Sequence, residues 1–203
     1  MRGGFGDQIA DTLVQLADVL EGLQPDEWGT QSLCARWSVR DVVGHLVWRV
    51  GSTYAAMART AAPMLALTRP SLDSITDAVS RQEGEASTPD DLVHRLRHIA
   101  ALRRAGIGRT GMTDLVETVV HSFDIVQPLG TPIEVDPDAT RRVALRGLLM
   151  ASADRRLVVG HHTLWASDAG WALGRGDIIE GSAQGIVLYV YGRSPVSGPA
   201  ARA

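Results

Sequence analysis

Apolar residues recur at alternating four- and three-residue steps near the start of the chain, and this spacing constrains the fold more than any other feature of the sequence. The first such series consists of Ile9, Leu13, Leu16, Leu20 and Leu23. Residues at these steps lie on one face of an α-helix. Because the residue before a proline disfavours helical backbone, we expect this helix to end at Gln24-Pro25. The narrow stripe is typical of a helix in a bundle.

Three more helices are bounded by start and stop signals. Ser38-Val39-Arg40-Asp41 matches a capping box, which predicts a helix that starts there and runs beyond Val50. Thr88-Pro89-Asp90-Asp91 starts another helix, which we expect to end at Gly106. A further helix is expected over residues 113–127, before a proline. Together with the first helix, these predict an antiparallel four-helix bundle.

The segment between the helix that starts near Ser38 and the helix that starts at Thr88 is harder to interpret. Residues 53–67 are rich in alanine and compatible with a helix, and Thr68-Arg69-Pro70-Ser71 interrupts it. Residues 73–87 are polar and only weakly helical. The sequence therefore assigns no role to residues 68–87.

The pattern changes in the last third of the chain. An Asp-Pro-Asp signal predicts a helix over residues 136–155. Across residues 157–180, apolar groups alternate with turn signals at 168–170 and 174–176, which predicts two or three short antiparallel strands. A last apolar helix is expected over residues 182–192, followed by a loose tail rich in Ser, Pro, Gly and Ala.

Composition excludes several classes of protein. With 45% hydrophobic residues, the 203-residue chain can form the core of one ordinary domain with a small appendage. Its net charge of −3 lacks the basic excess of a nucleic-acid binder. No apolar run approaches the roughly 20 residues that cross a bilayer, so we expect no membrane insertion. A single cysteine, Cys34, and an N-terminus without an apolar signal segment favour a cytoplasmic location.

Three residues are candidate metal ligands. Glu117 and His121 are four residues apart, so on a helix they lie one turn from each other and can reach a common ion. His45 would have to come from the helix that starts near Ser38. Two histidines and one carboxylate leave coordination positions open, which is what a catalytic divalent ion needs.

The same residues have a second interpretation. On a helical wheel, His45 lies opposite the apolar face of its helix, and Glu117 and His121 belong to a polar stripe. An acid and a histidine at this spacing are common on exposed helices. Both groups could therefore be solvated faces without a ligand.

Longer motifs favour the metal-site interpretation. The chain resembles the mycothiol-dependent maleylpyruvate isomerase family, one of the DinB-like metal-binding bundles. In the first part the resemblance rests on residues 37–46, 117–125 and 129–132. In the last part it rests on residues 167–171, 174–176, 180–183 and 192–193. It covers residues 8 to 193.

The resemblance implies a mainly α (α+β) fold, with a DinB-like antiparallel four-helix bundle followed by a small C-terminal α/β part. The expected divisions are a metal-binding bundle over residues 1–133, an α/β domain over residues 134–193 and a flexible tail over residues 194–203. It implies that His45, Glu117 and His121 bind a divalent metal, with zinc expected, and that the thiol cofactor is mycothiol.

Other residues receive smaller roles. Asp124 could act in catalysis by orienting a ligand, although an ion pair with an arginine explains it equally well. Arg49 could bind an anionic group of the cofactor, with a solvated arginine as the alternative. On the resemblance, Arg193 is a candidate for binding substrate or cofactor carboxylates. Cys34 could be a metal or redox thiol, with buried packing as the alternative.

The expected function is a metal- and mycothiol-dependent transferase or isomerase. A thiol bound to a metal is deprotonated near neutral pH, and the thiolate would attack a small electrophilic substrate. The partners are thus a small molecule and a low-molecular-weight thiol, without nucleic acid or membrane. The alternatives are a metal-dependent hydrolase on the same bundle and a non-catalytic small-molecule binding protein.

Overall fold

The computed structural model describes residues 4–67 and 71–193, and it divides into two compact units. One unit ends at Glu134 and the other begins at Val135. The expected break at Thr68-Arg69-Pro70 and the expected tail lie outside the described residues. Within the described residues, no helix is both long and apolar enough to cross a membrane.

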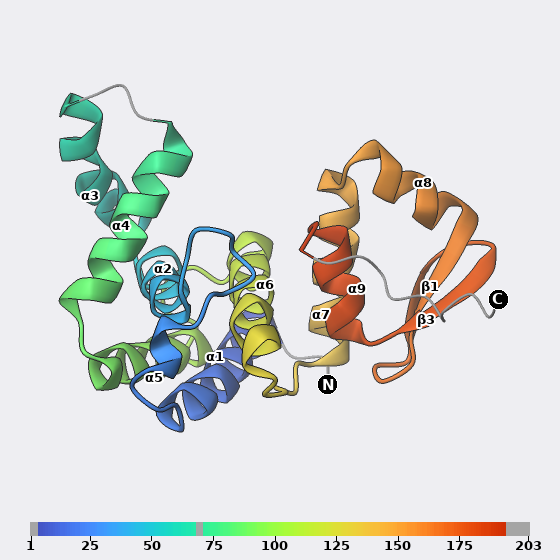
Figure 1. The fold of residues 1–203 in the computed structure, drawn as a ribbon, viewed down its shortest axis with the longest axis horizontal. Coiled ribbons are helices and arrows are strands. Elements are labelled where there is room, and N and C mark those ends of the chain that lie inside the picture. Colours follow the sequence, from blue (N-terminus) through green and yellow to red (C-terminus); the bar gives the residue numbers. More distant parts are fainter. Residues whose placement is uncertain (1–3, 68–70, 194–203) are drawn as a thin grey trace. The chain divides into compact units, whose positions relative to one another are not determined.

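The N-terminal unit is built around four helices, α1 (Phe5–Glu21), α2 (Val39–Gly51), α5 (Pro89–Arg104) and α6 (Met112–Leu129) (Figure 1). α1 packs against α5 and α6, and α2 packs against the same two helices. Their shared core contains the wholly buried side chains of Ile9, Leu13, Leu16, Leu46, Leu92, Leu96, Leu115 and Phe123. The predicted mainly helical fold class is confirmed.

The cap signals place the helix ends. Ser38 Oγ accepts from the Asp41 N–H, and the Asp41 carboxylate accepts from the Ser38 N–H, which confirms the predicted capping box. The expected end of α1 at Gln24 is wrong, because Gly22 already caps this helix. Pro128 does not end α6 either. It removes one N–H donor, and the Asp124 carbonyl that this donor would have bonded accepts from the Leu33 N–H instead. The helix ends at Gly130, whose φ of 67° is accessible to glycine.

Two further helices lie between α2 and α5. α3 (Tyr54–Leu67) agrees with the expected helix, and α4 (Leu72–Ala86) is a regular helix where the sequence appeared only weakly helical. α4 packs closely on α2. Its buried Ile75 and Val79 cluster with Trp48 of α2, which explains how a polar sequence forms a stable helix here.

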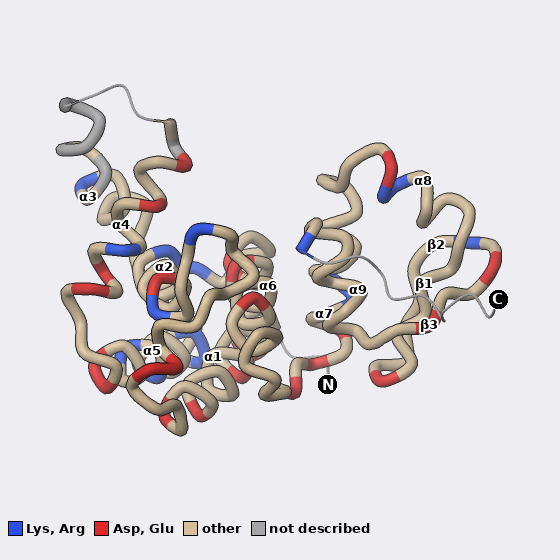
Figure 2. Tube along the Cα trace, in the orientation of Figure 1, with Lys and Arg blue, Asp and Glu red and all other residues tan. Residues whose placement is uncertain are grey.

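Acidic and basic residues are distributed along the helices of this unit (Figure 2), and some of them form ion pairs between helices. Arg97 of α5 donates to Asp18 and Glu21 of α1, each at 2.8 Å. A short 3-10 helix, η1 (Glu27–Gly29), precedes the loop that leads to α2. The exposed ion pairs of Arg97 with Asp18 and Glu21 each contribute little to the free energy of unfolding, so apolar burial stabilises the bundle.

The C-terminal unit contains α7 (Pro137–Met150), α8 (Ala153–His161) and α9 (Ala183–Val190), with a small sheet of β1 (His162–Ala166), β2 (Trp171–Gly174) and β3 (Asp177–Gly181). The expected single helix over residues 136–155 is wrong. The chain becomes extended at Ala151 and starts α8 after Ser152, so residues 157–161 are helical and not β.

The sheet is mixed, with the order β2-β1-β3. β1 pairs antiparallel with β2 and parallel with β3, so the expectation of a purely antiparallel sheet is wrong. The turn signal at 174–176 does not close a hairpin but carries the chain past the start of β1. At Gly174 and Gly176, φ is 95° and 106°, and an added Cβ would lie 2.2 Å and 2.0 Å from the His162 and His161 carbonyl oxygens. Only glycine permits this crossing.

Candidate metal centre

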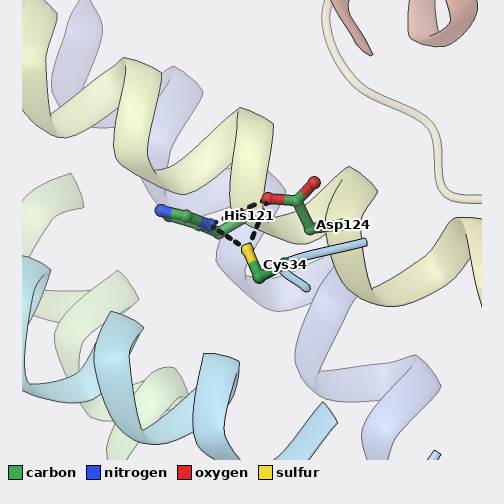
Figure 3. Close-up of side chains that lie close together, drawn as sticks. All are labelled: Cys34, His121 and Asp124. Carbon is green, nitrogen blue, oxygen red and sulfur yellow. Dashed lines mark hydrogen bonds and ion pairs between the residues drawn. The ribbon is translucent and has the colours of Figure 1, made fainter. Parts of the chain in front are cut away.

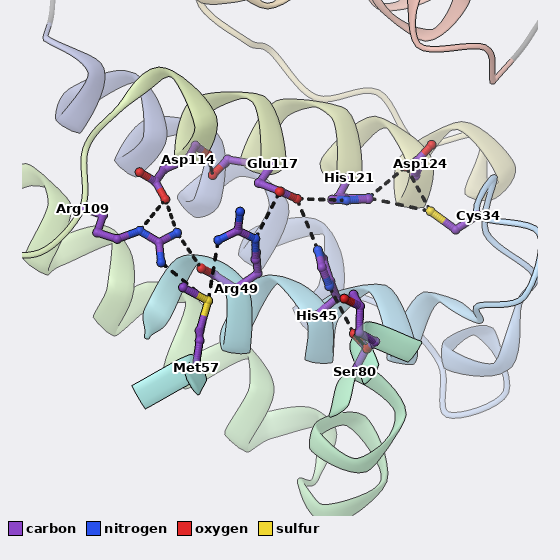
Figure 4. Close-up of polar contacts among 12 residues, drawn as sticks. Cys34, His45, Arg49, Met57, Ser80, Arg109, Asp114, Glu117, His121 and Asp124 are labelled. Carbon is purple, nitrogen blue, oxygen red and sulfur yellow. Dashed lines mark hydrogen bonds and ion pairs between the residues drawn. The ribbon is translucent and has the colours of Figure 1, made fainter. Parts of the chain in front are cut away.

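The three predicted metal ligands lie together inside the N-terminal unit. His45 comes from α2, and Glu117 and His121 come from adjacent turns of α6 (Figure 4). The Nε2 atoms of both imidazoles lie 3.3 Å from the same oxygen, Oε2 of Glu117. One ligand atom from each residue falls within 4.8 Å of the others. Such a set of two nitrogens and one oxygen fits a divalent cation with open coordination positions.

These side chains are not on a solvated face. His45 is only 4% exposed, and the side chains of His121 and Glu117 are 12% and 20% exposed. The polar stripe of α2 thus meets the polar stripe of α6 in the interior of the unit. The alternative expectation of two solvated faces is wrong for these residues.

The second nitrogen of each imidazole is also engaged. His121 Nδ1 lies 3.0 Å from Asp124 Oδ2, one turn further along α6. His45 Nδ1 lies 3.1 Å from the hydroxyl of Ser80, which comes from α4. Histidines that bind metals usually have their other ring nitrogen hydrogen-bonded in this way, because the bond fixes the orientation of the ring. The hydrogen bonds of the two Nδ1 atoms are therefore also those expected of histidines that bind a metal ion.

Two arginines lie beside the site, and one of them, Arg49, contacts the Glu117 carboxylate. Arg49 Nε lies 3.2 Å from Glu117 Oε1, so the expected alternative of a solvated arginine does not hold for this residue. Arg109 donates to the Arg49 carbonyl at 2.9 Å and to the Ser52 carbonyl at 3.1 Å, at the end of α2. Its guanidinium also pairs with Asp114 at the start of α6. These bonds fasten the end of α2 to the start of α6.

The electrostatics assign different charges to the three residues. Burial lowers the pKa of His45, which favours a neutral imidazole. Burial also disfavours a charged His121, but hydrogen bonds with Asp124, Cys34 and Glu117 raise the pKa of His121 well above its ordinary value. Burial acts to raise the pKa of Glu117, yet the hydrogen bond that its carboxylate accepts from His121 helps to hold this pKa well below the ordinary value. In the metal-free site, these shifts favour a carboxylate at Glu117, a protonated ring at His121 and a neutral ring at His45.

Cys34 forms a second group of possible ligands around His121 (Figure 3). Its Sγ lies 3.2 Å from Asp124 Oδ2 and 3.7 Å from His121 Nδ1. This group uses the opposite nitrogen of the His121 ring from the one that faces Glu117. The sequence left Cys34 between a metal thiol and buried packing, and gave no sign that it would lie beside His121.

A short loop positions Cys34 and an aromatic wall. Gln31 Nε2 donates to the carbonyl oxygens of Cys34 and Trp37, each at 2.9 Å, and the Leu33 N–H donates to the Asp124 carbonyl at 3.0 Å. The Trp37 ring lies 4.9 Å from the His45 ring, and the Trp48 ring lies 6.2 Å from it. Both indoles are 8% exposed and exclude water from this side of the histidines.

The remaining candidates have separate outcomes. Asp124 is wholly buried and contacts His121, as expected of a residue that orients a ligand. Arg193 follows α9 in the C-terminal unit, where its N–H donates to the Leu188 carbonyl at 2.8 Å, and its binding role stays a prediction.

The sequence did not predict Ser80 as a residue of the site, because Ser80 lies in the segment to which no role was assigned. The glycines at 44 and 84 were the available signal, since glycine within a helix often marks close packing.

Comparisons with known proteins agree with this architecture. The family model described as "Mycothiol maleylpyruvate isomerase N-terminal domain" matches residues 9–119, more than half of the chain. None of the curated proteins compared with the chain matches it.

Two solved structures are similar over almost the whole chain. One is the mycothiol-dependent maleylpyruvate isomerase, with 14% identity, a TM-score of 0.54, and coverage of 97% of this chain and 94% of that one. The other is a mutant of this isomerase in which one histidine is replaced by alanine, with 13% identity, a TM-score of 0.51, and coverage of 95% and 93%. At this identity, the similarity concerns the fold.

Proposed function

The chain belongs to the mycothiol maleylpyruvate isomerase N-terminal domain family, and on that premise we propose that it is a metal-dependent enzyme that uses a low-molecular-weight thiol. The metal would be held by His45, Glu117 and His121, and zinc is the ion we expect. The observation that carries this proposal is the convergence of two buried imidazole Nε2 atoms on one carboxylate oxygen, each at 3.3 Å. We further propose mycothiol as the thiol, and transfer or isomerisation of a small electrophilic molecule as the reaction.

A divalent cation bound here would favour the thiolate form of a coordinated thiol, which is the nucleophilic form. The chain's own residues prepare the place for it. Asp124 orients the His121 ring, Arg49 holds the free oxygen of Glu117, and Trp37 and Trp48 exclude water. We propose Arg49 and Arg193 as residues that bind anionic groups of the thiol or the substrate, and Asp124 as a residue that supports catalysis through His121.

Metal content tests the ligand set. Purified and zinc-reconstituted protein should hold one ion per chain, and His45→Ala, Glu117→Ala and His121→Ala should each lose it. His98→Ala removes an exposed histidine of α5 and serves as the matched control, with metal content expected to stay unchanged. Absence of stoichiometric metal in the wild type, before and after reconstitution, would refute the proposal.

Cobalt distinguishes this site from the group around Cys34. If the ion is held by His45, Glu117 and His121, the cobalt-substituted protein should have no thiolate-to-cobalt absorption in the near ultraviolet, and Cys34→Ser should retain the ion. A thiolate band that Cys34→Ser abolishes would assign the metal to Cys34, His121 and Asp124 instead.

The role of the thiol needs a separate assay. Metal-loaded protein is incubated with a panel of electrophiles, with and without mycothiol, and product is measured. We expect product only when the thiol is present, and we expect Arg193→Ala to raise the KM for thiol or substrate more than it lowers kcat. Turnover that does not depend on the thiol would indicate a metal-dependent hydrolase, and binding without turnover a non-catalytic small-molecule binding protein.

A further inference from the structure

Ser80 is the contact of the metal centre that comes from α4. Its side chain is wholly buried, and its Oγ lies 3.1 Å from His45 Nδ1 (Figure 4). Zinc in proteins is bound by cysteine, histidine and carboxylate side chains, so a serine hydroxyl is not one of its usual ligands. Its effect must therefore pass through the ring of His45.

The hydrogen atoms of this contact can be assigned by elimination. A hydroxyl has one hydrogen to donate, and Ser80 Oγ lies 2.6 Å from the carbonyl oxygen of Thr76, which can only accept. The Ser80 O–H therefore donates to Thr76. Toward His45, the same oxygen presents a lone pair, so Nδ1 of His45 must carry a proton and donate it to Ser80. An unprotonated Nδ1 would face this lone pair at 3.1 Å in a buried place.

The position of this proton decides whether His45 can bind a metal. A neutral imidazole has one N–H, so a proton on Nδ1 leaves the lone pair of Nε2 free. Glu117 Oε2 competes for the same proton, because a charged oxygen 3.3 Å from Nε2 favours the tautomer with the proton on Nε2. That tautomer has no lone pair on the nitrogen that faces the other ligands.

We propose that Ser80 is a positioning residue that holds His45 in the Nδ1-protonated tautomer, so that Nε2 is ready to bind a metal before any ion arrives. Its importance for the enzyme rests on the proposed function, but the tautomer is a property of the metal-free protein.

Contacts between backbones fix the position of Ser80. A Cβ added at Gly44 of α2 would lie 2.5 Å from the Ser80 carbonyl oxygen and 2.6 Å from the Gly84 nitrogen. Arg40 of α2 also donates to the Gly84 carbonyl at 2.8 Å and to the Ser87 carbonyl at 2.6 Å, at the end of α4. The backbones of α2 and α4 therefore touch at Gly44, and rotation of side chains cannot change the distance between the two helices.

The experiment is nitrogen-15 NMR of the histidine rings in the metal-free protein, at a pH where the His45 ring is neutral. In the wild type, we expect the Nδ1 resonance of His45 in the protonated range and its Nε2 resonance in the unprotonated range. In Ser80→Ala, the proton should move to Nε2 and bond to Glu117. Ser80→Thr keeps the hydroxyl and should restore the wild-type pattern.

Ser122→Ala is the matched control. Ser122 is also a wholly buried helix serine and lies next to His121, and its Oγ has no hydrogen-bond partner among the described residues. We expect this variant to keep the wild-type tautomer. Calorimetric titration with zinc should then show affinity about 10- to 100-fold weaker for Ser80→Ala and unchanged for Ser122→Ala, a loss typical of removing a residue that orients a ligand.

The outcomes separate this proposal from the proposed function. A wild-type protein with the His45 proton on Nε2 overturns the role of Ser80, whether or not any variant folds. An unchanged tautomer in folded Ser80→Ala, or the same change in Ser122→Ala, also overturns it. Failure of the wild type to bind zinc would refute the metal site alone, because the NMR result does not depend on metal.

Discussion

Replacing Gly44 by alanine tests whether the close approach of α2 and α4 sustains the metal centre. The new Cβ would lie 2.5 Å from the Ser80 carbonyl oxygen, 2.6 Å from the Gly84 nitrogen and 3.1 Å from the Gly84 Cα. All three are backbone atoms, so no side-chain rotation can relieve the overlap. α4 as a whole must move away from α2.

The size of the effect follows from these distances. An ordinary contact begins at 3.4 Å, so α4 must move by about 0.9 Å. The same movement would lengthen the bond between His45 Nδ1 and Ser80 Oγ from 3.1 Å to about 4 Å, beyond hydrogen-bonding distance. Overpacking of this kind costs about 1–3 kcal/mol. Alanine is favoured over glycine in a helix by about 1 kcal/mol, which offsets part of that cost.

We therefore expect Gly44→Ala to lower the free energy of unfolding by up to about 2 kcal/mol in urea titrations, and to weaken zinc binding about 10- to 100-fold. Gly160→Ala is the control, because Gly160 lies in helix α8 and an added Cβ would meet no atom within 4 Å. It should leave stability unchanged or raise it. Gly44→Ala protein that is as stable as the wild type and binds zinc equally well would refute this account of the packing.

Further predictions concern charge, ion pairing and backbone conformation. Because hydrogen bonds raise the pKa of His121, a metal must displace a proton from its Nε2, so zinc affinity should rise about tenfold per pH unit below that pKa. Calorimetry in two buffers of different ionisation enthalpy should detect about one released proton near pH 7, and no release would contradict the assignment. In the metal-free protein, the raised pKa of His121 contributes stability that is fully present below about pH 6.5 and is lost as pH rises through the folded-state value, as urea titrations across this range can measure. Asp114→Ala leaves Arg109, whose side chain is only 12% exposed, without its carboxylate and should cost about 3 kcal/mol of unfolding free energy. Asp18→Ala, in an exposed pair, should cost much less, and equal losses would contradict this ranking. In thermal unfolding, Gly174→Ala should destabilise the C-terminal unit far more than Gly170→Ala, because both have positive φ but only Gly174 has backbone oxygens in the place of the Cβ.

Local signals in the sequence predicted most of the fold. Capping at Ser38 and Thr88 and the apolar stripe of α1 depend on neighbouring residues only, and the structure has these helices. The errors arise where distant contacts decide the outcome. α4 is a helix because Ile75 and Val79 pack on Trp48. The glycines at 174 and 176 suggested a hairpin, but they serve a crossing that only the position of β1 explains.

In the candidate metal centre too, local signals predicted some contacts, and distant parts of the chain supply the others. Glu117 and His121 are one helical turn apart, so their proximity follows from the sequence, and the family resemblance added His45. Cys34 and Ser80 reach the histidines through a loop and a helix that no spacing rule connects with them. A helical wheel shows that His45 lies opposite the apolar face of its own helix. It could not show whether that side of the helix faces the solvent or the interior of the unit.

The short distance between the Trp37 indole and the imidazoles has a practical consequence. Its indole lies 4.9 Å from the His45 ring and 6.1 Å from the His121 ring, and four other tryptophans are present in the chain. At such separations, a paramagnetic ion such as cobalt or copper quenches indole emission efficiently. The intrinsic tryptophan fluorescence of the unlabelled protein thus reports whether the metal site is occupied, and competition between cations can be followed by fluorescence alone.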